Sequence, residues 1–558
     1  MNFSATRRAV VLLGALSLAP WAAWADTLPD AAAVARYAQG LLDEQGIDPK
    51  GPGLTLLVAR GDTLLATAAR GQASIELGVP LAPDHVMRLG SITKQFAAAT
   101  LLRLVDEGKA SLDDPLSKYL PDYPNGQAIT LTQLLNHTSG IKSYTGIGGY
   151  MHNPIRHDLS TQELVAVFKD QPADFAPGAR WAYNNSGYVL VGAVIEAITG
   201  KSWHEALQSN WLQPNRVAVS YPAPDRLIPG HVAGYTRSGN GWAPAGLVSM
   251  TQPHAAGALV GNVESLWRWN QALHEKGLLK PSTYQRMVTP QGPAEASRYG
   301  FGIGTDRIRG MAALQHGGGI HGFGTVLYYL PAQRITVALL RNSDRATPEL
   351  DPLARRLSAF AAGKAYPAAV PVAVPPATLK AFEGVYSQGA VTRTLRVVDG
   401  KLVSQRAGGS TVPLTPLGQD RFAVGTGLAQ LQFQRNAAGA VTGQVYYPDG
   451  DDQGPVEPLP RTGDLPQRPD LALSEAQRQA LVGQYVGERL SFSVFVDPQG
   501  VLRGQVPGQP AVTLKASAPR ELYVVEVDAS LSFGPAEGEV QTVVLKQGPG
   551  RFELKRQR

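Results

Sequence analysis

The segment Arg88-Leu89-Gly90-Ser91-Ile92-Thr93-Lys94 decides how the rest of this chain is interpreted. It opens a helical pattern that runs from Ile92 to Glu107 and stops at Gly108. Residues three apart share one face of a helix, so the Lys94 amine can reach the Ser91 hydroxyl. The helix N-terminus adds partial positive charge near Ser91, and burial would lower the pKa of Lys94 until it can act as a base. The segment therefore predicts a nucleophilic serine paired with a lysine base.

A second Ser-x-x-Lys match, Ser139-Gly140-Ile141-Lys142, occurs further along the chain. Ser139 follows Asn136-His137-Thr138 and precedes a glycine, a context that is typical of a loop. A loop does not hold a serine and a lysine in fixed register, so we assign Ser139 a structural role.

Two further segments carry side chains of the same chemistry. Tyr183-Asn184-Asn185 places a phenol and an amide two residues apart, although Tyr-x-Asn also recurs at Tyr123-Pro124-Asn125. His316-Gly317-Gly318-Gly319 precedes a strand that we expect from Gly324, and its glycines would let a strand edge approach a ligand closely. On its own, this glycine run is more often a turn.

In this order, the three segments and their surroundings resemble the penicillin-recognising serine hydrolases: class C β-lactamases, DD-carboxypeptidases, D-aminopeptidases and related esterases. The resemblance covers about residues 30–360. The matching segments are 88–94, Leu112-Asp113-Asp114-Pro115-Leu116, 129–140 from Ile129 to Gly140, 181–188 from Trp181 to Tyr188, Tyr299-Gly300-Phe301-Gly302 and 316–320 from His316 to Ile320.

The resemblance implies an acyl-enzyme mechanism that needs no cofactor and no metal. Ser91 would attack a carbonyl while Lys94 and Tyr183 move the proton. Asn185, His316 and Gly318 would contact the substrate, and the backbone N–H groups of Ser91 and Gly319 would form the oxyanion hole.

The substrate class follows from a departure from the family pattern. Most β-lactamases of this fold carry a lysine where this chain has His316, and a mostly neutral imidazole favours substrates without a carboxylate near the scissile bond. Domain organisation and motif spacing also resemble those of D-aminopeptidases. In those enzymes a loop from the last barrel restricts the site, and by analogy we expect one here.

Two alternatives to a D-aminopeptidase stay open. One is a broad esterase, weak β-lactamase or DD-carboxypeptidase of the same fold. The other is a non-catalytic peptidoglycan-binding protein, which would be expected to have lost part of the Ser91, Lys94 and Tyr183 set.

The N-terminus predicts a cleavable signal peptide over residues 1–25. Arg7-Arg8 precedes a short apolar run from Ala9 to Pro20, and Ala23-Trp24-Ala25 is a small-x-small cleavage site before Asp26. The arginine pair suits either the general or the twin-arginine route. We therefore expect an exported, periplasmic protein without a transmembrane segment.

The catalytic domain is expected over residues 26–365, as an α+β fold with helices and an antiparallel sheet. Its predicted strands are Leu54–Ala59, Thr63–Ala69, Gly324–Leu330 and Ile335–Leu340, at the two ends of the domain.

Residues 366–378 form a predicted Pro-rich linker, and two small antiparallel, lipocalin-like β-barrels follow at 379–462 and 479–558, with a second linker at 463–478. A repeat of about 100 residues supports this organisation. Gly384-Val385-Tyr386 matches Gly483-Gln484-Tyr485, and 429–433 matches 529–533. Each copy has room for about eight strands.

The composition of the 558 residues narrows the function classes. No cysteine is present, which excludes disulfides, thiolate metal sites and a cysteine nucleophile. The ten histidines form no HExxH motif, and the net charge of +6 is not gathered in a basic stripe. We expect a small peptide, amide or ester substrate and no nucleic-acid partner. The oligomeric state is left open, a homodimer included.

Overall fold

The computed structural model describes residues 28–557 except 240, 345–348, 399, 451–453, 466–468, 488–489, 508, 510 and 548–549. The predicted signal peptide at residues 1–25 lies outside the described residues. Within the described chain, no helix combines the length and apolar character needed to cross a bilayer.

A six-stranded antiparallel sheet forms the centre of the catalytic domain, in the order β2-β1-β12-β11-β10-β9. The strands are β1 Leu54–Arg60, β2 Thr63–Arg70, β9 Gly304–Ile308, β10 Met311–Ile320, β11 Phe323–Leu330 and β12 Ile335–Arg341. β1 pairs with β12, so the two ends of the domain meet in one sheet. The predicted α+β class with an antiparallel sheet is confirmed, and β9 and β10 are added to the predicted strands.

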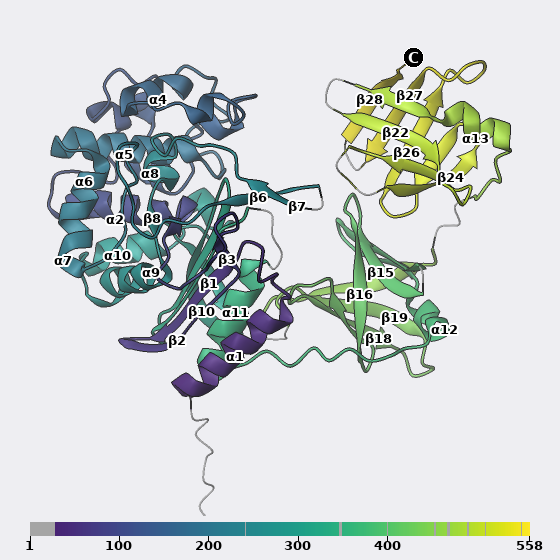
Figure 1. The fold of residues 1–558 in the computed structure, drawn as a ribbon, viewed down its shortest axis with the longest axis horizontal. Helices are drawn as coiled ribbons and strands as arrows, with labels where there is room; N and C mark the ends of the chain where they lie inside the picture. The colour runs from purple at the N-terminus through teal and green to yellow at the C-terminus, as the bar shows by residue number, and fades with distance from the viewer. Residues whose placement is uncertain are drawn as a thin grey trace, which may run out of the picture.

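Helices cover both faces of this sheet (Figure 1). α1 (Ala31–Glu44) and α11 (Leu350–Ala361) pack on one face, where Leu56, Val58 and Tyr328 join their core. On the other face lie α2 (Thr93–Asp106), α5 (Asn185–Thr199), α8 (His254–Gly257) and α9 (Val263–Asn270), against alternate residues of the same strands. This alternation follows from the two-residue period of a strand.

Shorter elements complete the helical side and brace the strand ends. The helices are α3 Leu131–Leu135, α4 Thr161–Phe168, α6 Trp203–Leu207, α7 Gln213–Asn215 and α10 Pro281–Val288. The two-stranded pairs are β3 Gln72–Ser74 with β4 Val79–Pro80, β5 Met87–Arg88 with β8 Val260–Gly261, and β6 Tyr235–Ser238 with β7 Gly241–Pro244.

Two closed barrels of eight strands each follow the catalytic domain. Barrel 1 consists of β13 Gly384–Gln388, β14 Val391–Val398, β15 Lys401–Arg406, β16 Thr411–Gly418, β17 Arg421–Val424, β18 Gln430–Arg435, β19 Val441–Tyr447 and β20 Glu457–Gly463. Barrel 2 consists of β21 Gly483–Val486, β22 Ser491–Val496, β23 Leu502–Gln505, β24 Val512–Ala518, β25 Glu521–Val524, β26 Ala529–Gly534, β27 Thr542–Gln547 and β28 Gly550–Arg556. The two predicted barrels are confirmed as part of the fold.

The two barrels share a register as well as a strand count. Gly384 pairs with Leu395 in barrel 1, and Gly483 pairs with Val494 in barrel 2. The Tyr386 hydroxyl donates to the Phe382 carbonyl at 2.8 Å, and Tyr485 donates to the Leu481 carbonyl at the same distance. These matched bonds fix each barrel to the helical segment before it, which ends in the 3₁₀ turn Lys380–Phe382 for barrel 1 and in a short α-helix for barrel 2.

The short helix α12 (Pro376–Leu379) directly precedes the 3₁₀ turn of barrel 1, and α13 (Glu475–Leu481) ends at Leu481 of barrel 2. α12 begins inside the stretch predicted as a Pro-rich linker, because a proline suits the first turn of a helix, where its missing N–H is not needed.

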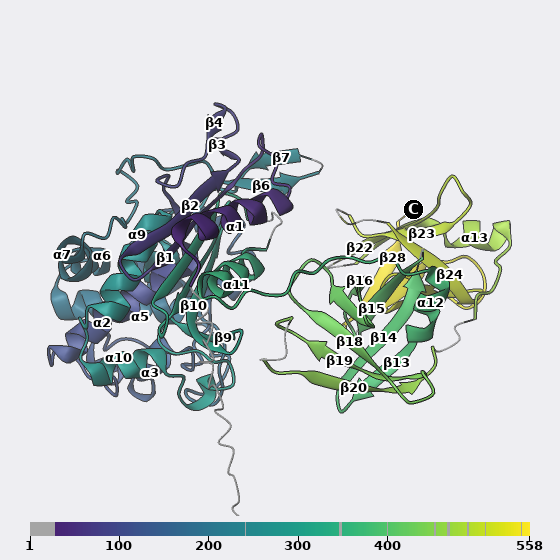
Figure 2. The ribbon, with the colours of Figure 1, turned by 90° about the horizontal axis from the view of Figure 1, so that it is seen from below.

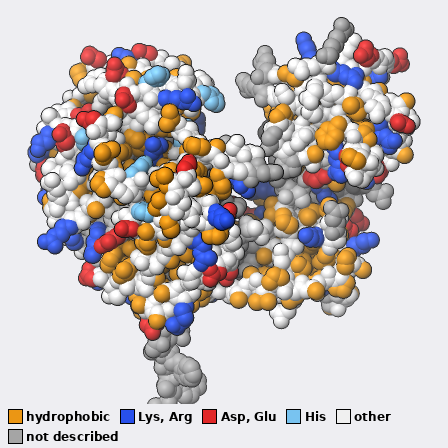
Figure 3. Space-filling view, viewed as in Figure 1, with side chains coloured by type: hydrophobic (Ala, Val, Ile, Leu, Met, Phe, Trp, Pro, Cys, Tyr) orange, Lys and Arg blue, Asp and Glu red, His pale blue; other side chains and the backbone are white. Residues whose placement is uncertain are grey.

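The barrels lie beside the catalytic domain rather than over it (Figures 1 and 2). Arg355 of α11 forms an ion pair with Asp449 of the β19–β20 loop at 2.9 Å. Barrel 2 contacts barrel 1, where Arg396 donates to the Val525 carbonyl at 2.6 Å. On the face shown in Figure 3, acidic and basic side chains are interspersed over both parts.

Candidate active site

Ser91 lies in a 3₁₀ turn, Gly90–Ile92, between β5 and α2. Gly90 has a φ of +54°, and a Cβ there would lie 2.9 Å from the Gly319 nitrogen. Only glycine meets both demands, so the turn brings Ser91 against the end of β10. The predicted Ser91–Lys94 register is present at the start of α2.

Lys94 is fully buried, and its amine contacts three oxygen atoms. Its Nζ lies 3.1 Å from Ser91 Oγ, 2.9 Å from Asn185 Oδ1 and 2.8 Å from the Ala256 carbonyl oxygen. All three partners are uncharged. Burial therefore holds the pKa of Lys94 well below its usual range. A neutral amine can donate to Asn185 and Ala256 and accept the Ser91 proton.

Asn185 is held by residues that the sequence reasoning did not single out. Its Nδ2 donates to Thr145 Oγ1 at 3.1 Å, and its backbone N–H donates to Ser143 Oγ at 3.3 Å. Ser143 and Thr145 contact each other at 3.0 Å. Both residues lie just after Lys142. No local pattern marks this segment, because only the tertiary fold places it beside α5.

Tyr183 lies immediately before α5, with its ring centroid 4.7 Å from Lys94 Nζ. Burial of the hydroxyl raises the pKa of Tyr183, and a hydrogen bond with Ser91 acts in the opposite direction. The side chain as a whole is 39% exposed, so the ring edge faces solvent while the hydroxyl faces the site. Ser91, Lys94, Tyr183 and Asn185 are thus brought together.

The glycines of β10 allow the strand to pass close to Ser91. A Cβ on Gly318 would lie 2.1 Å from the Leu89 carbonyl oxygen and 2.2 Å from Thr325 Oγ1, whereas a Cβ on Gly319 would meet nothing within 4 Å. Gly318 and Gly319 line the same pocket as Ser91. His316-Gly317-Gly318-Gly319 is therefore part of a strand and not a turn.

His316 is a buried residue of β10 whose ring centroid lies 6.3 Å from that of Tyr183, but it is not among the described residues that line the pocket. Its Nε2 lies 2.8 Å from the Tyr299 hydroxyl, and its Nδ1 lies 2.6 Å from the Gly317 carbonyl oxygen. Burial, together with the nearby Lys94, lowers the pKa of His316 to about 4. Direct substrate contact by His316 was expected, but the structure places it as a neutral support for Tyr299.

His137 is a second buried imidazole at the site. Its Nδ1 accepts from the Asn184 backbone N–H at 3.2 Å, and its ring lies 4.4 Å from that of Tyr183. Burial is the main reason why its pKa is well below the usual value. The Asn136-His137-Thr138 stretch quoted for the resemblance contains this residue, but its contact with the Tyr183 segment is visible only in three dimensions.

The second Ser-x-x-Lys match lies apart from this cluster. Ser139 is buried, and the Lys142 amine forms an ion pair with Asp174 at 2.8 Å. The serine and lysine therefore have no partnership like that of Ser91 and Lys94.

The Ser91 pocket has a volume of about 390 Å³, and all its described lining residues fall between Gly90 and Asp344. No described lining residue comes from either barrel, so the loop expected by analogy is not found there. Asp344, Arg341 and His321 supply ionisable side chains to the pocket. None of the three was singled out from the sequence.

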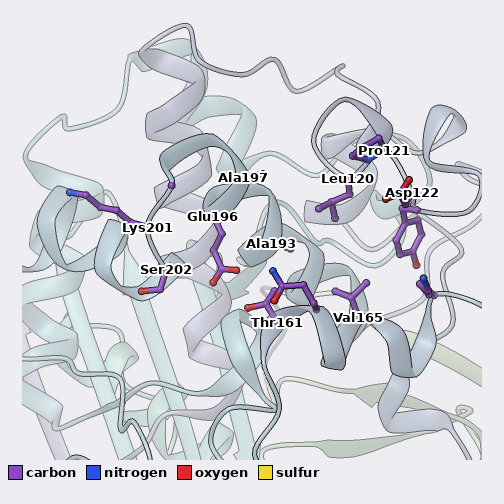
Figure 4. Close-up of a pocket in the computed structure, with 14 residues that line it drawn as sticks. Leu120, Pro121, Asp122, Thr161, Val165, Ala193, Glu196, Ala197, Lys201 and Ser202 are labelled. Atoms are coloured by element: carbon purple, nitrogen blue, oxygen red, sulfur yellow. The ribbon is translucent and has the colours of Figure 1, made fainter.

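A larger cavity of about 660 Å³ lies between α4 and the end of α5 (Figure 4). It is lined by Thr161, Val165, Glu196 and Lys201 among others, and contains neither Ser91 nor Lys94. The geometry for nucleophilic catalysis is thus confined to the smaller pocket. Among the described residues, no cluster of three or more histidine, aspartate or glutamate side chains could hold a metal ion.

Comparison with known proteins relates this chain to one family of hydrolases and penicillin-binding proteins. A family model described as Beta-lactamase matches residues 34–362. The D-aminopeptidase of Brucella ovis is 24% identical over 517 residues, which are 90% of this chain and 93% of that protein. The D-aminopeptidase of Gluconobacter oxydans is 26% identical over 297 residues, which are 52% of this chain. The putative penicillin-binding protein PbpX of Bacillus subtilis is 27% identical over 250 residues, which are 45% of this chain. The chain spans only 56% and 61% of the lengths of these last two relatives.

Solved structures show the same fold. SurE is 26% identical with a TM-score of 0.52, covering 77% of this chain and 99% of its own. The octameric penicillin-binding protein homologue from Pyrococcus abyssi is 24% identical with a TM-score of 0.54, covering 77% and 98%.

Proposed function

Because the chain belongs to the β-lactamase family, we propose that it hydrolyses small peptides or amides through an acyl-enzyme on Ser91 and releases N-terminal D-amino acids. The observation that carries the chemistry is the contact of 3.1 Å between Ser91 Oγ and a lysine amine with only uncharged hydrogen-bond partners. The relatives of this family are serine hydrolases, and the close approach of Ser91, Lys94, Tyr183 and Asn185 supports the same chemistry here.

The reaction follows from the contacts. Neutral Lys94 accepts the Ser91 proton while Oγ bonds to the substrate carbonyl carbon. The oxygen that becomes negative lies between the backbone N–H groups of Ser91 and Gly319. Tyr183 and Lys94 return the proton to the leaving amine as its bond to carbon breaks. A water molecule then releases the acyl group by the same path in reverse.

The substrate class rests on the relatives and on one pocket residue. The Brucella ovis relative named D-aminopeptidase aligns with this chain through the catalytic domain and into both barrels. In the pocket, Asp344 Oδ2 accepts from the Gly322 N–H at 3.1 Å. Asp344 Oδ1 is buried without a hydrogen-bond partner among the described residues. The Asp344 carboxylate interacts electrostatically with Arg341 in the same pocket, and its Oδ1 is suited to a hydrogen bond from a substrate ammonium group.

Asp344 lines the same pocket as Ser91 and Gly319, and its hydrogen-bond partner Gly322 is close to Gly319 in the chain. Gly322 follows Gly319 by three residues, which span at most about 10 Å when extended. The ammonium could therefore be the α-amino group of the acylated residue or one further along the acyl half.

An activity panel tests this function. The wild type should hydrolyse D-alanine p-nitroanilide faster than its L-enantiomer, p-nitrophenyl acetate or nitrocefin. Asp344→Asn keeps an acceptor for Gly322 and should lower kcat/KM for D-alanine p-nitroanilide by about 10- to 100-fold, mainly through KM. It should leave an N-acetyl-D-alanine anilide within about twofold.

Asp113→Asn serves as the matched control, because Asp113 is exposed beyond the far end of α2. If nitrocefin or the acetate ester is the best substrate, the D-aminopeptidase proposal fails. If D-alanine p-nitroanilide is preferred but Asp344→Asn affects both anilides equally, only the role of Asp344 fails.

A second candidate is a DD-carboxypeptidase or weak β-lactamase, and Arg341 favours it. This guanidinium lines the same pocket, so it could attract a substrate carboxylate. A penicillin-binding protein is also among the relatives. Faster turnover of nitrocefin or a D-Ala-D-Ala peptide than of any D-amino-acid amide would identify this alternative.

Export is the remaining part of the proposal. The small-x-small site before Asp26 supports cleavage of residues 1–25 and a periplasmic location. N-terminal sequencing of protein exported by the native host should begin at Asp26. A retained Met1 on periplasmic protein would contradict the cleavage.

A further inference from the structure

The interior of barrel 1 contains polar side chains where barrel 2, the second copy of the repeat, has none. The cross-strand pairs define which positions correspond. Gln444 pairs with Phe433, and Val543 pairs with Phe533, so Gln444 corresponds to Val543. By the same pairings, Arg393 corresponds to Phe492, Ser404 to Gly504, and Glu457 to Phe552. Four positions that are polar in barrel 1 therefore carry an apolar residue or a glycine in barrel 2.

Gln444, Ser404 and Arg393 point inward, because their cross-strand partners belong to the core, whereas the side chain of Glu457 is 40% exposed. Gln444 lies between Phe433 and Leu459, and Ser404 is opposite Leu395, all three being core residues. Residues directly opposite each other in a sheet share one face. Gln444 is 0% exposed and Arg393 is 7% exposed.

The polar atoms of this interior lack partners among the described residues. They are both amide atoms of Gln444, Ser404 Oγ, Arg393 Nε and Glu457 Oε2. Arg393 Nη2 and Glu457 Oε2 are 3.9 Å apart, so the two charges attract each other but do not form a short hydrogen bond. Buried polar groups in folded proteins are nearly always satisfied, by protein, water or ligand.

Arg393 and Glu457 lie at one end of the barrel, whereas Gln444 and Ser404 lie deeper in the interior, opposite core residues. α12 and the buried Leu379 and Phe382 close the other end, where the interior is apolar. The polar end carries the β19–β20 loop, whose Asp449 contacts α11 of the catalytic domain. Figure 1 shows α12 on the side of barrel 1 that is remote from the catalytic domain.

We propose that the polar end of barrel 1 binds a small zwitterion of the α-amino-acid class. Arg393 and the Gln444 amide nitrogen offer donors to a carboxylate. Glu457 and the Gln444 carbonyl offer acceptors to an ammonium. The one positive and one negative charge of the site match a ligand with no net charge, and the Tyr446 ring, 3.9 Å from the Arg393 guanidinium carbon, holds that guanidinium in place.

This inference does not rest on the proposed function, since none of these residues lines the Ser91 pocket. Equilibrium dialysis of radiolabelled glycine against the full chain tests it, with Ser91 capped by a fluorophosphonate so that the catalytic pocket is blocked. One saturable site is expected. Acetate and methylammonium, each half of the zwitterion, should bind at least about tenfold more weakly.

Gln444→Val and Arg393→Phe should each weaken glycine binding at least about tenfold. Both replacements copy barrel 2, so the barrel should remain folded, as circular dichroism would show. Gln434→Val makes the same chemical change at an exposed position of β18 and should leave binding within about twofold. Bound glycine should also raise the Tm of the wild type but not that of Gln444→Val.

Three results would overturn the proposal. Absence of saturable glycine binding, or equal binding by Gln444→Val, would mean that the interior holds water only. Binding of acetate or methylammonium as tight as that of glycine would exclude the zwitterion.

Discussion

At the residue scale, burial alone lowers the pKa of Lys94, without a neighbouring charge that would do so. Its amine contacts two side-chain oxygens and one carbonyl oxygen, none of them ionised. Removing a cation from water without a counter-ion favours its neutral form. The surrounding fold alone therefore prepares Lys94 for its proposed role as the base.

The lowered pKa of Lys94 sets the pH dependence of acylation. The base is active when neutral, so the acylation rate should rise with pH through the pKa of Lys94 and level off well below pH 10.5. His316, with a pKa of about 4, stays neutral through most of this range. Stopped-flow bursts with p-nitrophenyl acetate between pH 5 and 10 would measure the curve. Lys94→Arg stays protonated and should lose at least about a thousandfold in rate. A flat profile, or an active arginine variant, would contradict this role.

Ser91 and Ser139 form a natural pair for testing the nucleophile. Ser91→Ala should abolish labelling by a fluorophosphonate probe, because no other described serine contacts a buried lysine amine. Ser139→Ala should retain labelling, since the only lysine of its motif is paired with Asp174. Mass spectrometry of the labelled peptide identifies the site. Label on Ser139, or full labelling of Ser91→Ala, would refute the assignment.

The sequence predicted the members of the site better than their roles. Ser91, Lys94, Tyr183 and Asn185 were found from spacing and resemblance, and the structure brings them together. The resemblance predicted that His316 contacts the substrate, and the sequence alone does not show that its two ring nitrogens contact the Tyr299 hydroxyl and the Gly317 carbonyl. Asp344 was missed because a lone aspartate after a strand has no pattern of its own.

At the element scale, the close approach of β10 to the Ser91 turn depends on Gly318. Neither Gly318 nor Gly319 has a positive φ, so the difference between them is steric. Gly318→Ala would force a methyl group to within 2.1 Å of the Leu89 carbonyl oxygen. We expect it to lower the free energy of unfolding by about 1–3 kcal/mol or more and to displace the Gly319 N–H from the oxyanion hole.

Gly319→Ala provides the control, because a Cβ there meets no atom within 4 Å. Its unfolding free energy in urea should stay within about 0.5 kcal/mol of the wild type. Equal stability of the two variants would show that β10 can shift away from Leu89 without cost.

Elements with strong local patterns were predicted, and those that depend on partners were not. The hairpin β1–β2 and the strands β11 and β12 read as apolar runs around turns. β10 was missed in part because Gly317, Gly318 and Gly319 have low strand propensity, and only pairing with β11 holds them extended. α1 was not predicted, although Asp30 caps it and its apolar stripe packs on the sheet.

At the scale of the whole molecule, catalysis and the second barrel are separable. All described residues of the Ser91 pocket belong to the catalytic domain, and barrel 2 is bound to barrel 1 by hydrogen bonds from Arg396 and Thr411 to the Val525 and Glu526 carbonyls. A chain ending at Gly463 should therefore fold and keep kcat/KM for D-alanine p-nitroanilide within about threefold, with an unchanged ranking of substrates. A steady-state panel over amides of increasing length would measure this. Improved turnover of the longer amides would show that barrel 2 limits access to the pocket after all.

The pairing of β1 with β12 has a consequence for the timing of biosynthesis. The ribosome delivers residue 60 long before residue 341, and α1 must also wait for α11 at residues 350–361 to cover the same face of the sheet. At roughly 5–20 residues per second, that interval is about 15–60 seconds. During it, β1 has only β2 as a partner, and one edge of this apolar strand is open to other chains. The nascent protein therefore needs a chaperone, or rapid completion, more than its compact final domain would suggest.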